Sequence, residues 1–258
     1  MSMSDPVSMS GPAVRRLDRK LGAITAGRYT PGDFVIADAK DADMAFGLTS
    51  AGPARTAGPA RTTGPARTAR PARMAGSGRY RTRGDFLDDM RALVAQGELD
   101  IMLTSAANGE RLAQDGSLGD MTLAVRGNDS TDIWNSRGGR YPALPSRPFR
   151  TADLSAVRPF CDLVLYSMTF NNDLDYDLAT LEAYNSFRRE AATLGIRHFL
   201  EVFNPNAPAG LAEVGAFVND SITRALAGVT GAQRPLFLKV AYNGPDALAE
   251  LAGYDPSL

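Results

Sequence analysis

The chain alternates short, nearly continuous apolar runs with longer segments whose apolar residues recur at helical spacing. Six runs predict buried strands: 33–39, 99–106, 121–129, 160–168, 197–204 and 235–242. The segments between most of them predict helices, such as the one in which Leu178, Leu181 and Tyr184 share a face. Buried strands separated by helices are typical of a parallel sheet that is covered on both faces.

Capping residues mark where the predicted helices begin and end. Thr82 and Asp85 have the spacing of a capping box at the start of one helix. Asp177 is placed to begin the long fourth helix, and Gly195 is placed to end it. Pro245 suits the first turn of the last helix.

Polar residues at strand ends distinguish between the two architectures that fit this pattern, a doubly wound sheet and a (β/α)8 barrel. They fall in or just after the predicted strands: Asp38, Asn108, Arg126, Asp129, Thr169, Asn171, Glu201, Asn204 and Lys239. Active groups gathered from many strand ends are typical of TIM-type barrels. No Gly-x-Gly-x-x-Gly follows a strand, which weakens the doubly wound alternative. We therefore expect residues 1–258 to form a single (β/α)8 barrel domain.

The predicted barrel is two strands short. Six strands are counted, and the sequence stops shortly after the sixth helix. We expect strands 7 and 8 to be missing because the sequence is a C-terminally truncated piece of a longer protein. The missing part would hold the loops with which such barrels commonly bind phosphate.

A hexapeptide repeat over residues 52–75 interrupts the chain after the first strand. It reads GPARTA GPARTT GPARTA RPARMA, and residues 52–78 form a low-complexity insertion in the first strand–helix loop. Its residue types cannot build a core. We favour a tolerated repeat expansion in a surface loop over an arginine-rich arm that binds phosphate or RNA.

Composition excludes several classes of function. The net charge is −1 and the pI is near 5.9, so there is no global attraction to nucleic acid or acidic lipid. Cys161 and His198 are the only residues of their kinds, which argues against a zinc enzyme and against Ser-His or Cys-His triads. Without an internal disulfide, a signal peptide or an apolar run long enough for a membrane span, the chain is expected to be cytoplasmic. A homo-oligomer is compatible with this composition.

Lys239 and Glu201 are the two candidate groups for chemistry. Each lies in an apolar strand, in LFLKVAY and HFLEVFN, and neighbouring parallel strands would place the two heads close together. Burial penalises the ammonium form of a lysine and so favours the nucleophilic neutral amine. Such an amine attacks a carbonyl carbon to form an iminium, and a nearby carboxylate can transfer the protons. A purely structural ion pair is the alternative interpretation.

Residues 162–206, together with PLFLKVAYNGP, resemble the class I, metal-independent aldolases of the DeoC, tagatose-1,6-bisphosphate and DhnA group. The resemblance implies a (β/α)8 barrel that cleaves or forms C–C bonds in sugar-like carbonyl compounds without a metal or cofactor. It also implies that Lys239 forms the Schiff base and that Glu201 is the acid/base group. Asp38 matches loosely an aspartate that ends the first strand in relatives. The fourth strand lacks the lysine that sugar-bisphosphate relatives carry there.

We therefore expect a class I aldolase or related lyase acting on a sugar or sugar phosphate. Asp38 would orient the lysine or a substrate hydroxyl, while Arg126, Asn171, Asn204 and Asn108 would contact the substrate. Arg126 or Arg137, in the polar segment after the third strand, would hold an anion. Two alternatives stay open: a non-catalytic sugar-phosphate-binding barrel with a Lys239–Glu201 ion pair, and a nucleic-acid tether formed by the arginine repeat.

Overall fold

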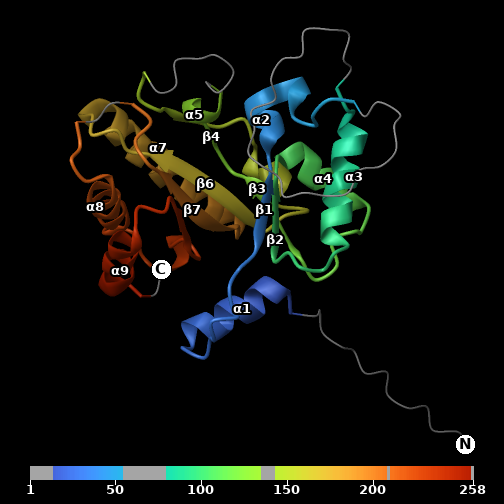
Figure 1. Ribbon diagram of the computed structural model, residues 1–258, viewed down its shortest axis with the longest axis horizontal. Coiled ribbons are helices and arrows are strands. Elements are labelled where there is room, and N and C mark those ends of the chain that lie inside the picture. Colours follow the sequence, from blue (N-terminus) through green and yellow to red (C-terminus); the bar gives the residue numbers. More distant parts are fainter. Residues whose placement is uncertain (1–13, 55–79, 135–142, 208–209, 257–258) are drawn as a thin grey trace, which may run out of the picture.

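One curved sheet of six parallel strands forms the centre of the computed structural model (Figure 1). The structure describes residues 14–54, 80–134, 143–207 and 210–256. The strands follow one another across the sheet in chain order: β1 (Ala37–Lys40), β2 (Ile101–Thr104), β3 (Thr122–Arg126), β6 (Leu163–Thr169), β7 (Arg197–Phe203) and β8 (Leu238–Val240). A doubly wound sheet reverses this order at one point. The sequential order excludes that fold, and the sheet curls into an open half-barrel.

Helices pack against the outer, convex face of the half-barrel. They are α3 (Arg83–Val94), α4 (Ala106–Gln114), α6 (Leu154–Val157), α7 (Leu174–Leu194), α8 (Val214–Leu226) and α9 (Pro245–Tyr254). Short elements lie beyond the carboxyl ends of the strands: α2 (Ala42–Phe46), the 3-10 helix η1 (Gly47–Thr49), α5 (Thr131–Trp134) and the β4–β5 ribbon (Asp129–Ser130, Pro148–Phe149). The turn η3 (Gly231–Gln233) precedes β8. All six predicted strands are confirmed.

The predicted helix boundaries are confirmed with one correction. Thr82 and Asp85 form a reciprocal capping box at the start of α3, Gly195 ends α7 with φ +64°, and Pro245 opens α9. The start of α7 was placed wrongly at Asp177. Its N-cap is Asp173, and Asp177 instead accepts a hydrogen bond from a backbone N–H of the preceding loop.

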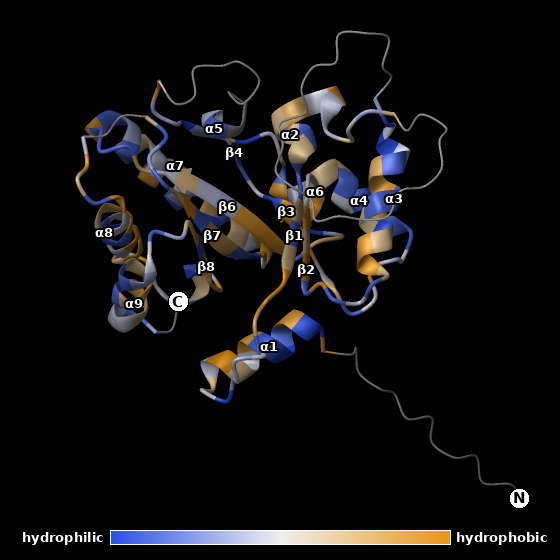
Figure 2. Cartoon of the chain, in the orientation of Figure 1, coloured by the Kyte–Doolittle hydropathy of each residue, from blue (hydrophilic) through white to orange (hydrophobic). Residues whose placement is uncertain are grey.

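Two cores sandwich the sheet, because successive strand residues point to opposite faces. Outside, residues such as Val125, Tyr166 and Leu200 pack against α7 and α8. Inside, Leu103, Leu165 and Phe199 pack around one residue of helix α1 (Arg16–Thr25), Leu17, which is fully buried. Figure 2 shows the apolar strands at the centre of the molecule. Helix α1 therefore closes the amino end of the half-barrel, and the sequence pattern did not reveal this helix.

The ends of the low-complexity insertion are held together. An isolated bridge joins Pro53 to Tyr80, and the Arg81 N–H donates to the Gly52 carbonyl at 2.9 Å. Most of the predicted 52–78 insertion falls in residues 55–79 and lies outside the described residues. Across the described ranges, the longest and most apolar helices fall short of what a bilayer span requires.

Candidate active site

Four inward-facing polar residues lie side by side near the carboxyl ends of four adjacent strands. Ser167 on β6 is in register with Glu201 on β7, and Glu201 is in register with Lys239 on β8. Arg126 is the last residue of β3. It is in register with Leu165, which precedes Ser167 by two residues on β6. Strand alternation puts all four on the same face as the inner core. The sequence thus places a polar group directly above the apolar floor of the half-barrel.

Glu201 is the centre of this group. Its Oε1 forms an ion pair with the Lys239 ammonium, and its Oε2 accepts a hydrogen bond from the Ser167 hydroxyl at 2.7 Å. Arg126 approaches the same Oε2 to 3.6 Å. The carboxylate is almost completely buried, with 6% of the side chain exposed. A carboxylate bound on both oxygens is fixed in orientation, with one oxygen directed at the lysine nitrogen.

Arg126 supports Glu201 and is fully engaged by protein groups. Its Nε donates to the Asp41 carboxylate at 2.6 Å, and one terminal nitrogen donates to the Ser167 hydroxyl at 2.9 Å. The arginine side chain is 5% exposed. The expected substrate anion would have to displace Asp41 or Glu201 to reach it. The structure therefore brings Arg126 to the site as a support for the carboxylate; Arg137 lies outside the described residues.

The Asn128 side chain binds the backbone of Ser167. Its side-chain amide donates to the Ser167 carbonyl at 2.8 Å and accepts from the Ser167 N–H at 2.7 Å. Both residues are buried. This clamp fixes the backbone that directs the Ser167 hydroxyl at Glu201. The sequence pattern did not identify Ser167 or Asn128 as site residues. Ser167 could have been found, because Ser167 and Thr169 are polar residues on one face of an otherwise apolar strand.

Lys239 is more exposed than its apolar neighbours suggested. β8 is an edge of the six-stranded sheet, and 48% of the lysine side chain is accessible. The expectation of a buried lysine is corrected on this point, because no described strand covers the far side of β8. The ion pair with Glu201 holds the ammonium group over the inner face.

Asp38 is not brought to this group. It is in register with Met102, whose side chain packs in the outer core beside α3. Asp38 therefore points away from the interior and pairs with Lys40, on the same face, at 3.1 Å. The carboxylate that reaches the site from the end of β1 is Asp41, three residues later.

Two predicted substrate contacts are engaged elsewhere. Asn108, buried in α4, donates to Asp43 at 3.0 Å and accepts from Arg83 at 2.7 Å. Asn204 and Asn243 exchange two amide hydrogen bonds of 2.8 and 2.9 Å beyond β7 and β8. These contacts tie loops together, and neither asparagine meets the Glu201 group.

Asn171 and Asp132 lie above the group, past the end of β6. Asn171 is 4% exposed, and both polar atoms of its amide lack a hydrogen-bond partner. Asp132 on α5 accepts from the Thr169 hydroxyl at 2.6 Å through Oδ2, while its buried Oδ1 has no partner. Burial raises the pKa of Asp132, against the opposing effects of Ser146, Thr169 and Arg126. Asp132 was also missed, because its loop gives no periodic signal.

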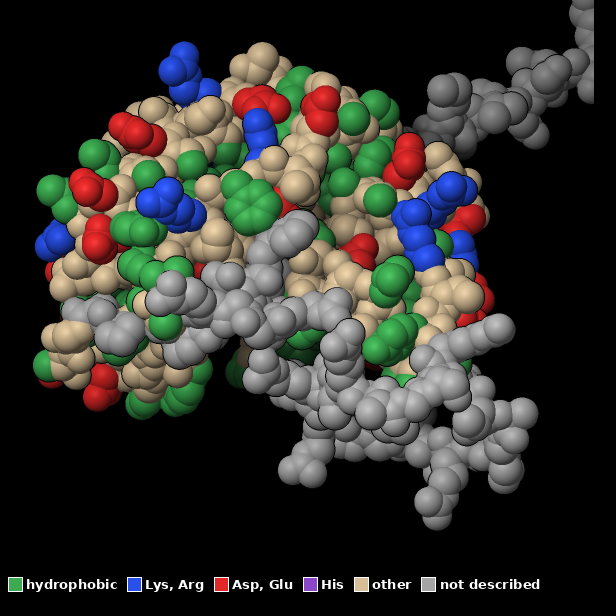
Figure 3. Space-filling view, turned by 90° about the horizontal axis from the view of Figure 1, so that it is seen from above, with side chains coloured by type: hydrophobic (Ala, Val, Ile, Leu, Met, Phe, Trp, Pro, Cys, Tyr) green, Lys and Arg blue, Asp and Glu red, His purple; other side chains and the backbone are tan. Residues whose placement is uncertain are grey.

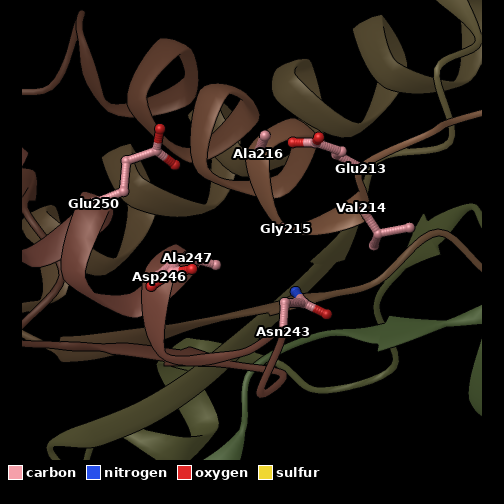
Figure 4. A pocket seen from close by; sticks show the side chains of 8 residues that line it. All are labelled: Glu213, Val214, Gly215, Ala216, Asn243, Asp246, Ala247 and Glu250. Carbon is pink, nitrogen blue, oxygen red and sulfur yellow. The ribbon is translucent and has the colours of Figure 1, made fainter.

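A hollow lies outside the half-barrel, between the first turns of α8 and α9 (Figure 4). Its volume is about 480 Å³, and it is lined by Glu213, Val214, Gly215, Ala216, Asn243, Asp246, Ala247 and Glu250. The acidic side chains come from both helices. Glu213 and Asp246 lie at the amino ends of α8 and α9, where negative charge is ordinarily favourable.

Other reactive side chains of the chain are separate from the Glu201 group. Burial raises the pKa of the Cys161 thiol to about 11 and keeps it protonated. His198, on the outer face of β7, contacts the Tyr184 hydroxyl at 2.9 Å. Figure 3 views the molecule from the side of the carboxyl ends of the strands, and basic and acidic side chains are interspersed on the described surface that it shows. Within the described ranges, no three His, Cys, Asp or Glu side chains are grouped as metal ligands would be.

Comparisons with known proteins found no matching family model, no matching curated protein and no matching solved structure.

Proposed function

We propose that the chain is a class I aldolase-type lyase in which Lys239 forms a Schiff base and Glu201 transfers protons. The observation that carries this proposal is the Lys239–Glu201 pair at the carboxyl end of a sequentially ordered parallel half-barrel. Active groups of (β/α)8 barrels lie at this end. We further propose that the six strands belong to such a barrel.

The reaction would begin with transfer of a proton from the Lys239 ammonium to Glu201. The neutral amine then attacks the substrate carbonyl carbon, and one proton moves from the attacking nitrogen to the carbonyl oxygen to give a carbinolamine. Glu201 returns the other proton to the resulting hydroxyl group, which leaves as water as the iminium forms. The resulting iminium accepts the electron pair of the breaking C–C bond and becomes an enamine. Glu201 takes the proton of the β-hydroxyl group as the second carbonyl forms. Protonation of the enamine and hydrolysis restore the amine.

The surroundings of Glu201 suit this role. Ser167 and Arg126 hold Oε2, so Oε1 stays directed at the lysine nitrogen throughout the proton transfers. Asp41 balances the charge of Arg126. The partial exposure of Lys239 leaves a path by which a carbonyl compound can reach the amine.

Borohydride trapping tests the proposal sharply because the chain has only three lysines, Lys20, Lys40 and Lys239. We expect that reduction in the presence of dihydroxyacetone or glyceraldehyde adds one adduct, on Lys239, as located by peptide mass spectrometry. Lys239→Met should abolish the adduct. Lys40→Met is the matched control, because Lys40 points to the opposite face and its loss should leave trapping unchanged.

Glu201→Gln separates chemistry from mere exposure of the lysine. The amide cannot transfer protons, and we expect trapping to slow by about 100-fold, within the range of general acid–base effects. Equal labelling of Lys20 and Lys40, or an unchanged rate in Glu201→Gln, would refute the assignment.

A non-catalytic sugar-phosphate-binding barrel is the second candidate function. The ion pair between Lys239 and a fixed, buried Glu201 favours it, because structural pairs have the same geometry. In that case Lys239 would give no adduct at all with the carbonyl compounds above.

A further inference from the structure

The positive charges at the candidate site are all matched by carboxylates. Among the described residues, Arg126 and Lys239 are its two cations, and Asp41 and Glu201 pair with them. Asp132 adds a further carboxyl group above them. A phosphate dianion that binds beside Glu201 would therefore have to displace a carboxylate from Arg126 or Lys239, and it would lie close to the acidic Asp132.

Unlike the paired charged groups, the polar side chains beyond the end of β6 include buried atoms that have no hydrogen-bond partner. Asp132 Oδ1 is a hydrogen-bond acceptor, and the Asn171 amide can both donate and accept. All three atoms are buried and unpaired in the structure. A buried polar group without a partner costs roughly 1–3 kcal/mol. A hydroxyl group, which donates and accepts at once, can satisfy both side chains.

The spacing along β6 relates these groups to the reactive lysine. Ser167 marks the level of Glu201 and Lys239, and Thr169, which binds Asp132, lies two residues further along the same face. Two residues of strand span about 7 Å. An extended carbon chain advances about 1.3 Å per C–C bond, so four to six carbons span about 4–6 Å, and a hydrogen bond of about 2.8 Å at the far end extends the reach to about 7–9 Å. Asn171 follows Thr169 by two residues, just beyond the end of the strand.

We propose that this site binds an uncharged, polyhydroxylated chain of four to six carbons, with hydroxyl groups hydrogen-bonded to Asp132 Oδ1 and to the Asn171 amide. This inference rests on the aldolase function proposed above and names its substrate class. The substrate carries hydroxyl groups, not a phosphate, at the end that faces α5 and the β6 terminus. The engagement of Arg126 by Asp41 and Glu201 supports the same conclusion.

Binding of sugar alcohols to the full chain tests the inference without any Schiff base, because these compounds have no carbonyl group. Saturation-transfer NMR and calorimetry with erythritol, xylitol and sorbitol should detect binding, and sorbitol 6-phosphate should bind more weakly than sorbitol. Asp132→Asn and Asn171→Ala should each weaken sorbitol binding at least tenfold. Asp220→Asn is the matched control, because Asp220 is an exposed partner of Arg224 on α8.

The outcomes separate this inference from the proposed function. Tighter binding of sorbitol 6-phosphate than of sorbitol by the wild-type chain would overturn the inference, even if both variants failed to fold. Sorbitol binding that is undetectable, or that is unchanged in both folded variants, would overturn it as well. A missing borohydride adduct with intact, variant-sensitive sorbitol binding would refute the aldolase proposal alone and leave a polyol-binding site.

Discussion

Glu201 shows how much a single buried side chain depends on its neighbours. It contacts Lys239, Ser167 and Arg126, and these contacts extend to Asp41 and Asn128. Residues on four strands and two loops thus fix one carboxylate. Removing one partner of such a network leaves other buried polar groups unpaired, so its members are expected to act together and not additively.

His198 makes stability depend on pH. Burial, assisted by the nearby charge of Arg188, lowers the pKa of its imidazole to about 4 from an ordinary value of 6.5. Between these two values the unfolded chain takes up a proton that the folded chain does not. The free energy of unfolding should therefore fall by up to about 3 kcal/mol as the pH drops from 6.5 to 4.

Denaturant titrations at several pH values check this prediction. His198→Gln should remove that part of the pH dependence. Tyr184→Phe is the matched variant: it deletes the hydrogen bond to the imidazole but keeps His198 buried, so the dependence should persist. The same slope in wild type and His198→Gln would contradict the assignment.

At single positions, strand alternation decides what can be predicted. Glu201 and Lys239 could be placed together from sequence because both sit at the same point of apolar strands. Asp38 could not, because the last residues of a short edge strand leave the facing side ambiguous; β1 extends to Lys40, and the carboxylate at the site is Asp41. Asp132 lies on α5, a helix of only four residues, which is too short to show a periodic pattern of apolar residues.

At the level of helices and strands, close approach of α4 to β3 depends on Gly109. A Cβ atom added there would lie 2.7 Å from Val125 Cγ1, inside a buried contact. Gly22 in α1 is the contrasting case, since a Cβ there would meet nothing within 4 Å. Both glycines lie within helices.

These two positions predict opposite effects of the same substitution. Gly109→Ala should lower the free energy of unfolding by about 1–3 kcal/mol through overpacking. Gly22→Ala should raise it by up to about 1 kcal/mol, because alanine is the better helix former. Urea denaturation of both variants measures the difference. Stabilisation by both substitutions would show that α4 can shift away from β3.

The strands could be recognised because parallel strands buried on both faces are nearly continuous in apolar residues. Helix α1 could not, since few of its residues are buried and its contacts are made with distant parts of the chain. The start of α7 was misplaced because Asp173 and Asp177 have equal capping ability. Only the tertiary position of the loop shows which of them caps the helix.

For the whole molecule, α1 joins the amino ends of several strands. Asp18 pairs with Arg197 on β7, and Lys20 pairs with the fully buried Asp100 before β2. Leu17 lies in the inner core between them. The helix therefore both closes the half-barrel floor and ties its separate strands together.

Leu17→Ala should consequently destabilise the whole sheet. We expect a loss of about 2–5 kcal/mol in the free energy of unfolding, the usual range for a fully buried leucine. Ile24→Ala, on the exposed side of α1, should change it by less than about 1 kcal/mol. Thermal denaturation followed by circular dichroism compares the two. A small effect of Leu17→Ala would mean that the sheet is stable without its floor.

The bridge between Pro53 and Tyr80 holds the two ends of the insertion together, and this has a consequence for how the gene can vary in length. Replication slippage at a tandem repeat adds or deletes whole units, here of six residues. The entropy of closing a loop grows only with the logarithm of its length, about 0.6 kcal/mol per doubling. Alleles with different numbers of units should thus encode the same half-barrel, and this repeat tract is where length polymorphism would be tolerated.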